Sequence, residues 1–162
     1  MRSQKRMKTY VVLENIRSAH NVGSVFRTAD GAGADKVFLT GYTPSPKDRF
    51  GRIQKEIKKT SLGASESVSW EQVEDIQQLL KRLKSESVEI IAVEQTDKAI
   101  PHQDFIQKKD TAYIFGNEVD GVSEATLAEA DVVLEIPMHG TKESLNVSVS
   151  VGVVLFSIQQ HQ

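Results

Sequence analysis

Residues 144–152 combine apolar character with regularly placed hydrogen-bonding groups, directly after a strand-like run that ends at Met138. The segment reads Ser-Leu-Asn-Val-Ser-Val-Ser-Val-Gly, so polar side chains alternate with apolar ones. A segment this apolar is expected to be buried, and buried hydroxyl and amide groups cost free energy unless they are paired. The alternation therefore predicts a segment built to hold a polar ligand.

Two glycines make residues 115–123 the second candidate for a binding loop. Gly116 and Gly121 allow the backbone to approach a ligand closely, and N–H groups at the start of the following helix favour negative charge. The glycine spacing resembles a phosphate loop, but Val122 stands where such a loop has its lysine, so a nucleoside triphosphate site is not expected. Residues 31–33 likewise lack the third glycine of a dinucleotide fingerprint.

Arg27 is the third residue whose chemistry is of interest. On a helix it shares a face with Gly23 and Ser24, and the glycine leaves space beside the guanidinium for a bulky partner. Taken singly, Arg27 is more often a solvated surface arginine, Asn21 a helix cap and Glu118 a first-turn carboxylate near a helix start. Both interpretations stay open at this level.

An alternation of strands and helices must position these residues. Apolar runs bounded by turn residues predict strands at Tyr10–Glu14, Lys36–Thr40, Glu89–Glu94, Ala112–Phe115 and Val132–Pro137. Helical periodicity covers Val22–Ala29, which stops at Gly31 and Gly33, then Val73–Leu83, and a shorter stretch capped by Ser123. The alternation predicts an α/β fold with a mostly parallel sheet and helices on both faces, which binds ligands at the carboxyl ends of its strands.

Residues 145–151 are ambiguous by pattern. Their strict alternation is typical of a strand, and pattern alone leans slightly that way. The apolar character continues to Ile158, however, which is typical of a helix that is buried or lies at a subunit interface.

The composition excludes several classes of protein. The chain of 162 residues fits one domain, and 39% hydrophobic with 26% charged residues are globular values. We expect no membrane span and no signal peptide, because no apolar run approaches the roughly 18 residues that a span needs. The absence of cysteine excludes disulfides and suits the reducing cytoplasm, and the four histidines lack metal-ligand spacing, so we expect no metal.

Charge is distributed unevenly along the chain. Residues 1–60 hold 13 Lys and Arg against 5 Asp and Glu, whereas residues 61–162 hold 7 against 17. This asymmetry predicts a surface that faces a polyanion on an otherwise acidic body, and ordinary scatter of surface charge is the alternative.

Several of these segments together resemble the motifs of one family. Asn21-x5-Arg27, then Phe115–Glu118, then Ile136–Met138 with Ser144–Ser148 resemble the three motifs of the SpoU (TrmH-type) RNA methyltransferases of the SPOUT class. Further matches are Arg27–Asp30, Lys59–Ala64 and Ala92–Thr96. The resemblance covers nearly the whole chain, with the motifs in order. Any single motif would be weak evidence for the family, whereas several in register are strong evidence.

The resemblance implies a fold, an activity and an assembly. Members of this family transfer the methyl group of S-adenosylmethionine to a ribose 2′-hydroxyl of RNA, act as homodimers and carry a deep trefoil knot at the C-terminal end of the sheet. For this chain it implies a single domain over residues 1–162, with a knot region near 112–160, a basic arm near 1–8 and no separate RNA-binding domain. It also implies that residues 145–151 are a helix.

The resemblance assigns roles to individual residues. The implied cofactor-binding set is Gln95, Thr96, Gly116, Asn117, Ile136, Met138, Ser144, Leu145 and Asn146, largely through backbone groups. The implied catalytic set is Arg27, Asn21, Glu118, Ser144 and Asn146. Because an arginine holds its proton too tightly to be an ordinary base, we expect Arg27 to orient the 2′-hydroxyl and an adjacent phosphate and to stabilise the developing alkoxide.

RNA contact has candidates of its own in the basic segment, residues 47–59, and in the N-terminal arm. The expected RNA-binding set is Arg49, Arg52, Lys55, Lys58 and Lys59, together with Arg6 and Lys8. As a helix, the basic segment would press Phe50, Ile53 and Ile57 on the body and present its cations to phosphates. We expect tRNA or rRNA in the cytoplasm as the partner. The alternatives are a non-catalytic RNA-binding module of the same fold, a base-methylating knotted enzyme, and a small-molecule or nucleotide-binding α/β protein.

Overall fold

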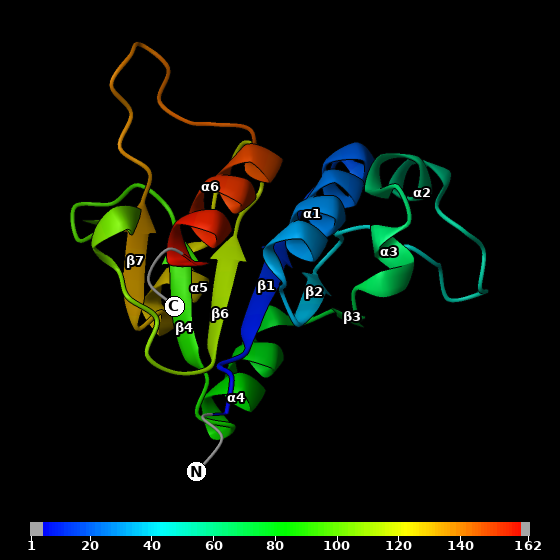
Figure 1. Cartoon of the computed structure of the whole chain (residues 1–162), viewed down its shortest axis with the longest axis horizontal. Coiled ribbons are helices and arrows are strands. Elements are labelled where there is room, and N and C mark those ends of the chain that lie inside the picture. The colour runs from blue at the N-terminus through cyan, green and yellow to red at the C-terminus, as the bar shows by residue number, and fades with distance from the viewer. Residues whose placement is uncertain (1–4, 160–162) are drawn as a thin grey trace.

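A computed structural model describes residues 5–159, which form a parallel sheet covered by helices on both faces (Figure 1). The strands are β1 (Thr9–Glu14), β2 (Lys36–Thr40), β3 (Trp70–Val73), β4 (Glu89–Val93), β5 (Ile100–Pro101), β6 (Thr111–Phe115) and β7 (Val132–Glu135). The helices are α1 (Ala19–Ala32), α2 (Lys55–Ser61), α3 (Ala64–Ser67), α4 (Ile76–Ser85), α5 (Glu124–Glu129), α6 (Val147–Gln159) and the 3-10 turn η1 (His102–Asp104). The strand order is β3-β2-β1-β6-β4-β7-β5, and the pairings are parallel.

The inner strand β1 separates two apolar cores. Val11 and Leu13 point to the face covered by α1 and α6, which run beside each other in Figure 1, whereas Val12 points to the face covered by α4. All three side chains are fully buried. A parallel strand that is buried on both faces is apolar at successive positions, which explains this continuous run and confirms the predicted fold class.

Helix α1 is bounded by two local devices. The hydroxyl of Ser18 accepts a hydrogen bond from the backbone N–H of Asn21, so Ser18 is the N-cap and the alternative role of Asn21 as the cap is wrong. At the other end Gly33 adopts the left-handed conformation with φ 73° and closes the helix. Gly31 lies within the helix, two residues before this stop.

The segment that pattern left ambiguous, residues 145–151, is a helix from Val147 onward, as the resemblance implied, and Leu145 and Asn146 precede the helix. Its polar positions are not buried as expected, because Ser144 and Asn146 lie in the exposed loop before α6 and Ser148 and Ser150 are half-buried. The apolar positions carry the packing of α6 on α1. Among residues 5–159 no helix has the length and apolar character needed to cross a membrane. The trefoil knot stays a prediction.

Two strands were missed by the sequence patterns. Strand β3 has the mixed sequence Trp-Glu-Gln-Val at the edge of the sheet, and Val73 belongs to it instead of to the following helix. Strand β5 has only two residues, Ile100 and Pro101, and pairs with β7. Edge strands are buried on fewer sides, so they lack the long apolar run by which the inner strands were found.

The basic segment is not one helix, and its predicted apolar seam is wrong. Only Ile57 is buried, whereas the side chains of Phe50 and Ile53 are 67% and 50% exposed. The carboxylate of Asp48 accepts hydrogen bonds from the backbone N–H groups of Phe50 and Arg52, which closes a turn over residues 48–52. This turn keeps the chain non-helical until α2.

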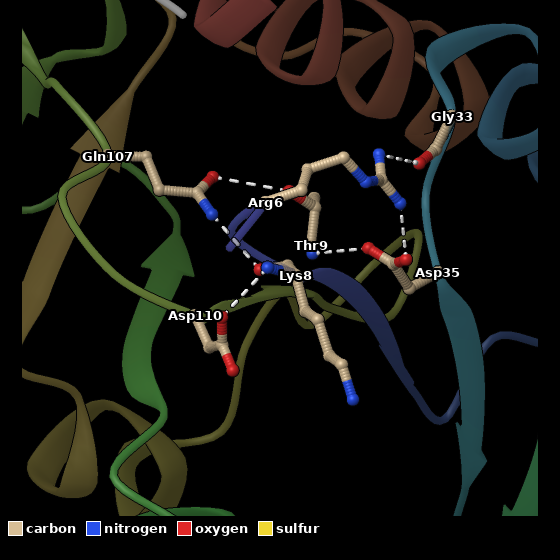
Figure 2. Close-up of polar contacts among 7 residues, drawn as sticks. All are labelled: Arg6, Lys8, Thr9, Gly33, Asp35, Gln107 and Asp110. Carbon is tan, nitrogen blue, oxygen red and sulfur yellow. Dashed lines mark hydrogen bonds and ion pairs between the residues drawn. The ribbon is translucent and has the colours of Figure 1, made fainter. Parts of the chain in front are cut away.

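The described part of the N-terminal arm is bound to the protein (Figure 2). Arg6 forms an ion pair with Asp35 and reaches the carbonyl oxygen of Gly33, while the backbone N–H of Lys8 donates to the Asp110 carboxylate at 2.8 Å. These contacts lie at the amino-terminal ends of the strands. Arg6 of the basic arm near 1–8 is thus paired within the chain, while its side chain stays largely exposed. Residues 1–4 lie outside the described part.

Candidate functional site

A cavity of about 530 Å³ opens at the carboxyl ends of β4, β6 and β7. Its wall comes from three segments: the end of β4 with residues 94–96, the loop 116–122, and the loop between β7 and α6. Figure 1 shows the last of these, drawn in orange, rising beyond the strand ends. All nine residues of the implied cofactor-binding set line this cavity, and so do Glu118, Ser144 and Asn146 of the implied catalytic set.

The loop 116–122 is shaped by contacts within itself. The backbones of Asn117 and Gly121 exchange hydrogen bonds of 3.1 and 2.9 Å, and the side-chain oxygen of Asn117 accepts from the N–H groups of Val119 and Asp120. A Cβ atom on Gly116 would lie 2.2 Å from the backbone of Gly121. Glycine at position 116 is thus required by the loop's own backbone, and not only by a ligand as the sequence suggested.

Glu118 connects this loop to the start of α1. Its carboxylate accepts hydrogen bonds from the backbone N–H of Arg17 at 3.1 Å and from that of Ser18 at 3.4 Å. The favourable field at a helix N-terminus supports a carboxylate here. The helix start that Glu118 serves is that of α1, about one hundred residues earlier in the chain.

Asn21 and Asn146 meet at the edge of the cavity. The side-chain amide of Asn146 donates to the side-chain oxygen of Asn21 at 3.3 Å. Asn146 also accepts from the backbone N–H of Ser148 at 2.9 Å, at the start of α6. Two of the implied catalytic residues, 125 positions apart in sequence, are therefore in contact.

Arg27 lies outside the cavity wall. It is exposed on α1, six residues and about 9 Å of helix axis beyond Asn21. A Cβ atom on Gly23 would lie 1.7 Å from the hydroxyl of Thr60 and 2.9 Å from the carbonyl oxygen of Ile57. The prediction of free space beside the guanidinium is therefore wrong, because the space at Gly23 is filled by the close packing of α2 and is not open to a ligand.

A family model, described as the SpoU rRNA Methylase family, matches residues 8–156. This chain belongs to that family. It is 33% identical to the 23S rRNA (guanosine-2'-O-)-methyltransferase RlmB of Neisseria meningitidis over 145 residues, which are 90% of this chain and 55% of the relative. The chain thus spans little more than half the length of that relative.

Solved structures agree with this family. An AdoMet-bound rRNA methyltransferase from Sinorhizobium meliloti matches with a TM-score of 0.85 and 25% identity, over 98% of this chain and 59% of that one. A TrmH/SpoU tRNA-modifying enzyme from A. aeolicus matches with a TM-score of 0.83 and 26% identity, over 96% of this chain and 76% of that one. The resemblance stated from the motifs is confirmed.

Two carboxylates of this SpoU-family site were missed by the sequence analysis. Glu14 is 3% exposed and accepts from the backbone N–H of Ser123 at 2.7 Å and from the hydroxyl of Thr126. Glu94 accepts from the backbone N–H of Val122 at 2.9 Å. Each follows an apolar strand run, which is the signal that could have revealed them. Two N–H groups just before α5, those of Val122 and Ser123, are thus occupied by the protein's own carboxylates.

The wall of the cavity is acidic. It contains Glu94, Glu118, Asp120, Glu135 and Glu143, and among the described residues no Lys, Arg or His lines it. Residues 5–159 also hold no group of three or more His, Cys, Asp or Glu that could bind a metal ion. A neutral or cationic organic ligand fits this wall better than a phosphate does.

One polar atom in the wall lacks a partner. The hydroxyl oxygen of Thr96 is buried and has no hydrogen-bond partner within the described part of the chain. Its neighbour Gln95 is engaged, because its side-chain amide donates to the carbonyl oxygen of Glu143 at 2.6 Å. Buried hydroxyl groups are normally paired, so the Thr96 hydroxyl is suited to hydrogen bonding with a ligand.

The predicted RNA-binding residues fall into two groups. Arg49, Arg52, Lys55, Lys58 and Lys59 are exposed on α2 and on the loop before it. This loop leaves the carboxyl end of β2, at the same edge of the sheet as the cavity. Arg6 and Lys8 lie at the other edge, where Figure 2 shows them bound to Asp35 and Asp110. Only the first group lies at the same end of the sheet as the cavity.

Proposed function

We propose that this domain transfers a methyl group from S-adenosylmethionine to a ribose 2′-hydroxyl of tRNA or rRNA. The observation that carries the proposal is the meeting of three motif segments at one cavity, with Asn21 and Asn146 in contact at its edge. Support comes from the named activities of the relatives, which are an rRNA guanosine-2'-O-methyltransferase and a tRNA-modifying enzyme. We extend the proposal to action in the cytoplasm.

The cavity fits the cofactor in size and chemistry. Its volume of about 530 Å³ lies within the range of small-molecule sites. When bound, S-adenosylmethionine supplies a methyl group on a positively charged sulfur. The acidic wall suits that charge, and the unpaired hydroxyl of Thr96 together with the backbone around Gly116 and Leu145 would bind the rest of the molecule.

The chain's own residues have to prepare the attacking oxygen. The 2′-oxygen would form its bond to the methyl carbon as the carbon–sulfur bond breaks, and the hydroxyl proton would leave to water. Arg27 would hold the hydroxyl and a neighbouring phosphate and stabilise the negative charge that develops on oxygen. Asn21 and Asn146 would fix the position of the ribose, and Glu118 would hold the start of α1, which presents Asn21.

We also propose that the active form is a homodimer. Val149 and Phe156 on α6 are 49% and 47% exposed, and α6 otherwise packs on α1. Burial of these side chains by a second copy would stabilise the assembly. Arg27 lies outside the wall of the cavity in its own chain. This separation favours an arrangement in which the substrate, or a second copy of the chain, bridges the distance between Arg27 and the cavity. A monomer at micromolar concentration in light scattering would contradict it.

Methyl transfer to bulk RNA tests the function. Purified protein is incubated with S-adenosylmethionine carrying a labelled methyl group and with total tRNA or rRNA, and the RNA is digested to nucleosides. Label in 2′-O-methylnucleosides is the expected result. Label on bases would indicate the base-methylating alternative, and RNA binding without any label would indicate the non-catalytic module. Thermal stabilisation by NAD or ATP instead of S-adenosylmethionine would contradict the cofactor assignment.

A further inference from the structure

The segment between β2 and α2, residues 41–54, exposes two aromatic rings among cations. Tyr42 is 60% exposed and Phe50 is 67% exposed, and this segment and α2 together carry most of the predicted RNA-binding residues. Single exposed apolar residues are ordinary. What distinguishes these two is that neighbouring residues hold each of them in a fixed position at the surface.

Tyr42 is bound at both ends of the residue and remains open to solvent. Its backbone N–H donates to the side-chain oxygen of Asn15 at 3.2 Å, and its hydroxyl accepts from the side-chain amide of Asn117 at 2.9 Å. Asn117 lines the cavity. Gly41 permits this arrangement, because a Cβ atom there would lie 1.8 Å from the same Asn15 oxygen. The ring is therefore fixed beside the loop that forms the cavity wall.

Phe50 is held in a turn between two arginines. Asp48 accepts hydrogen bonds from the backbone N–H groups of Phe50 and Arg52, each at 2.9 Å, and Gly51 has a φ of 76°. The guanidinium carbons of Arg49 and Arg52 lie 4.8 and 5.0 Å from the centre of the Phe50 ring. Aromatic rings and guanidinium planes are the two side-chain surfaces on which nucleobases stack.

These features favour unpaired RNA over duplex RNA. The bases of a double helix are stacked on one another, so a protein reads a duplex mainly through its shape and its backbone. The exposed rings have no use in that mode, whereas the cations serve both. A ring that is already fixed loses little freedom when a base stacks on it, which favours binding.

We infer that the segment 41–54 stacks on unpaired nucleotides of the RNA, so that the modified nucleotide lies in a loop or single strand. This inference rests on the proposed function and deepens it. Tyr42, at the cavity, contacts a base next to the reacting ribose. Phe50 with Arg49 and Arg52 contacts nucleotides farther along the strand.

Fluorescence anisotropy with two RNAs tests the inference. One is a stem–loop with unpaired loop nucleotides, and the other is a fully paired duplex of the same length. Wild-type protein binds the stem–loop more tightly. Tyr42→Leu and Phe50→Leu each weaken stem–loop binding about tenfold and leave duplex binding unchanged, whereas Tyr42→Phe and Phe50→Tyr keep most of the affinity. Ile106→Ala, which trims another half-exposed side chain far from this segment, is the control.

The salt dependence separates stacking from charge. Phe50→Leu leaves the slope of log affinity against log salt unchanged, while Arg49→Gln lowers it by about 0.7, as expected for one phosphate contact on single-stranded RNA. Equal binding of both RNAs, or leucine variants that bind the stem–loop like wild type, overturns the inference while leaving the proposed function intact. Leucine variants that change the oligomeric state but not the RNA affinity also overturn it, since the rings then serve a second copy. Wild-type protein that binds neither RNA overturns the proposed function itself.

Discussion

The side-chain amide of Asn146 donates a hydrogen bond of 3.3 Å to the side-chain oxygen of Asn21. This contact joins the N-terminal ends of α1 and α6, which carry the first and third sequence motifs. Because the two helices also pack on each other along their length, the motifs are held by the body of the fold and not by flexible loops alone.

Replacement of Arg27 tests its separation from the cofactor. Arg27→Ala should lower kcat by about 100-fold or more, because a preorganised charge donor at the reacting oxygen is lost. Its affinity for S-adenosylmethionine, measured by calorimetry, should stay close to that of wild type, since Arg27 is not part of the cavity wall. Arg27→Lys should recover only part of the activity, because lysine lacks the planar fork. Equal losses in turnover and cofactor affinity would contradict this assignment.

Thr96→Val should weaken the binding of the cofactor without lowering the stability of the fold. The hydroxyl has no partner within the described chain, so its removal should leave the free energy of unfolding unchanged or raise it by up to about 1 kcal/mol. The loss of one hydrogen bond to the cofactor should lower its affinity about tenfold.

A matched control for that change is Thr43→Val. The Thr43 hydroxyl accepts from the backbone N–H of Ile16 at 3.0 Å and donates to the carbonyl oxygen of Thr40 at 2.7 Å. Its removal should cost about 1–3 kcal/mol in urea denaturation, because a buried N–H group is left unpaired. If both variants unfold alike, the Thr96 hydroxyl is not free in the protein.

Two glycines of α1 should respond oppositely to alanine. Gly23→Ala should destabilise the protein by about 1–3 kcal/mol, because the new Cβ atom would collide with Thr60 and with the carbonyl oxygen of Ile57. Gly31→Ala places its Cβ atom no nearer than 3.5 Å to Phe156 and should stabilise the helix by about 0.5–1 kcal/mol. Thermal and urea unfolding measure both. A Gly23→Ala protein as stable as wild type would mean that α2 does not pack here.

Acid should destabilise the protein through His102. Burial lowers the pKa of this imidazole below its ordinary value of 6.5, and its Nδ1 atom lies 3.0 Å from the Ser157 hydroxyl of α6. The native state therefore binds fewer protons than the unfolded state once the pH falls below about 6.5, so its stability declines until the lowered native pKa is passed. His102→Gln should remove this part of the decline. An unchanged difference between wild type and variant from pH 7 to pH 5 would refute it.

The inner part of the fold could be predicted from the sequence because strands that are buried on both faces consist of continuous apolar runs. Strand β2 has the expected bounds, β1 begins one residue earlier than expected, and Ser123 caps α5 by accepting from the backbone N–H of Thr126. Strands β3 and β5 lie toward the edges, and their short, mixed sequences carry no comparable pattern. The turn at Asp48 was also missed, because one carboxylate with two backbone partners overrides a helical spacing of apolar residues.

The site was predictable only through the family motifs. Single residues such as Glu118 and Asn21 allowed local readings, and their true partners lie more than one hundred residues away. Periodicity describes neighbours on one element and carries no information on such contacts. The partners of Glu14 could not be predicted from periodicity either. Glu14 ends a strand in the sequence, and its three hydrogen bonds reach Ser123 and Thr126.

The five carboxylates around the cavity make it favour a positively charged ligand over a neutral one. A donor with a sulfonium centre enters with one more positive charge than the thioether that remains after transfer, and the field of the wall therefore favours the fresh molecule over the spent one. Release of the by-product would thus be assisted by the same surface that attracts its replacement.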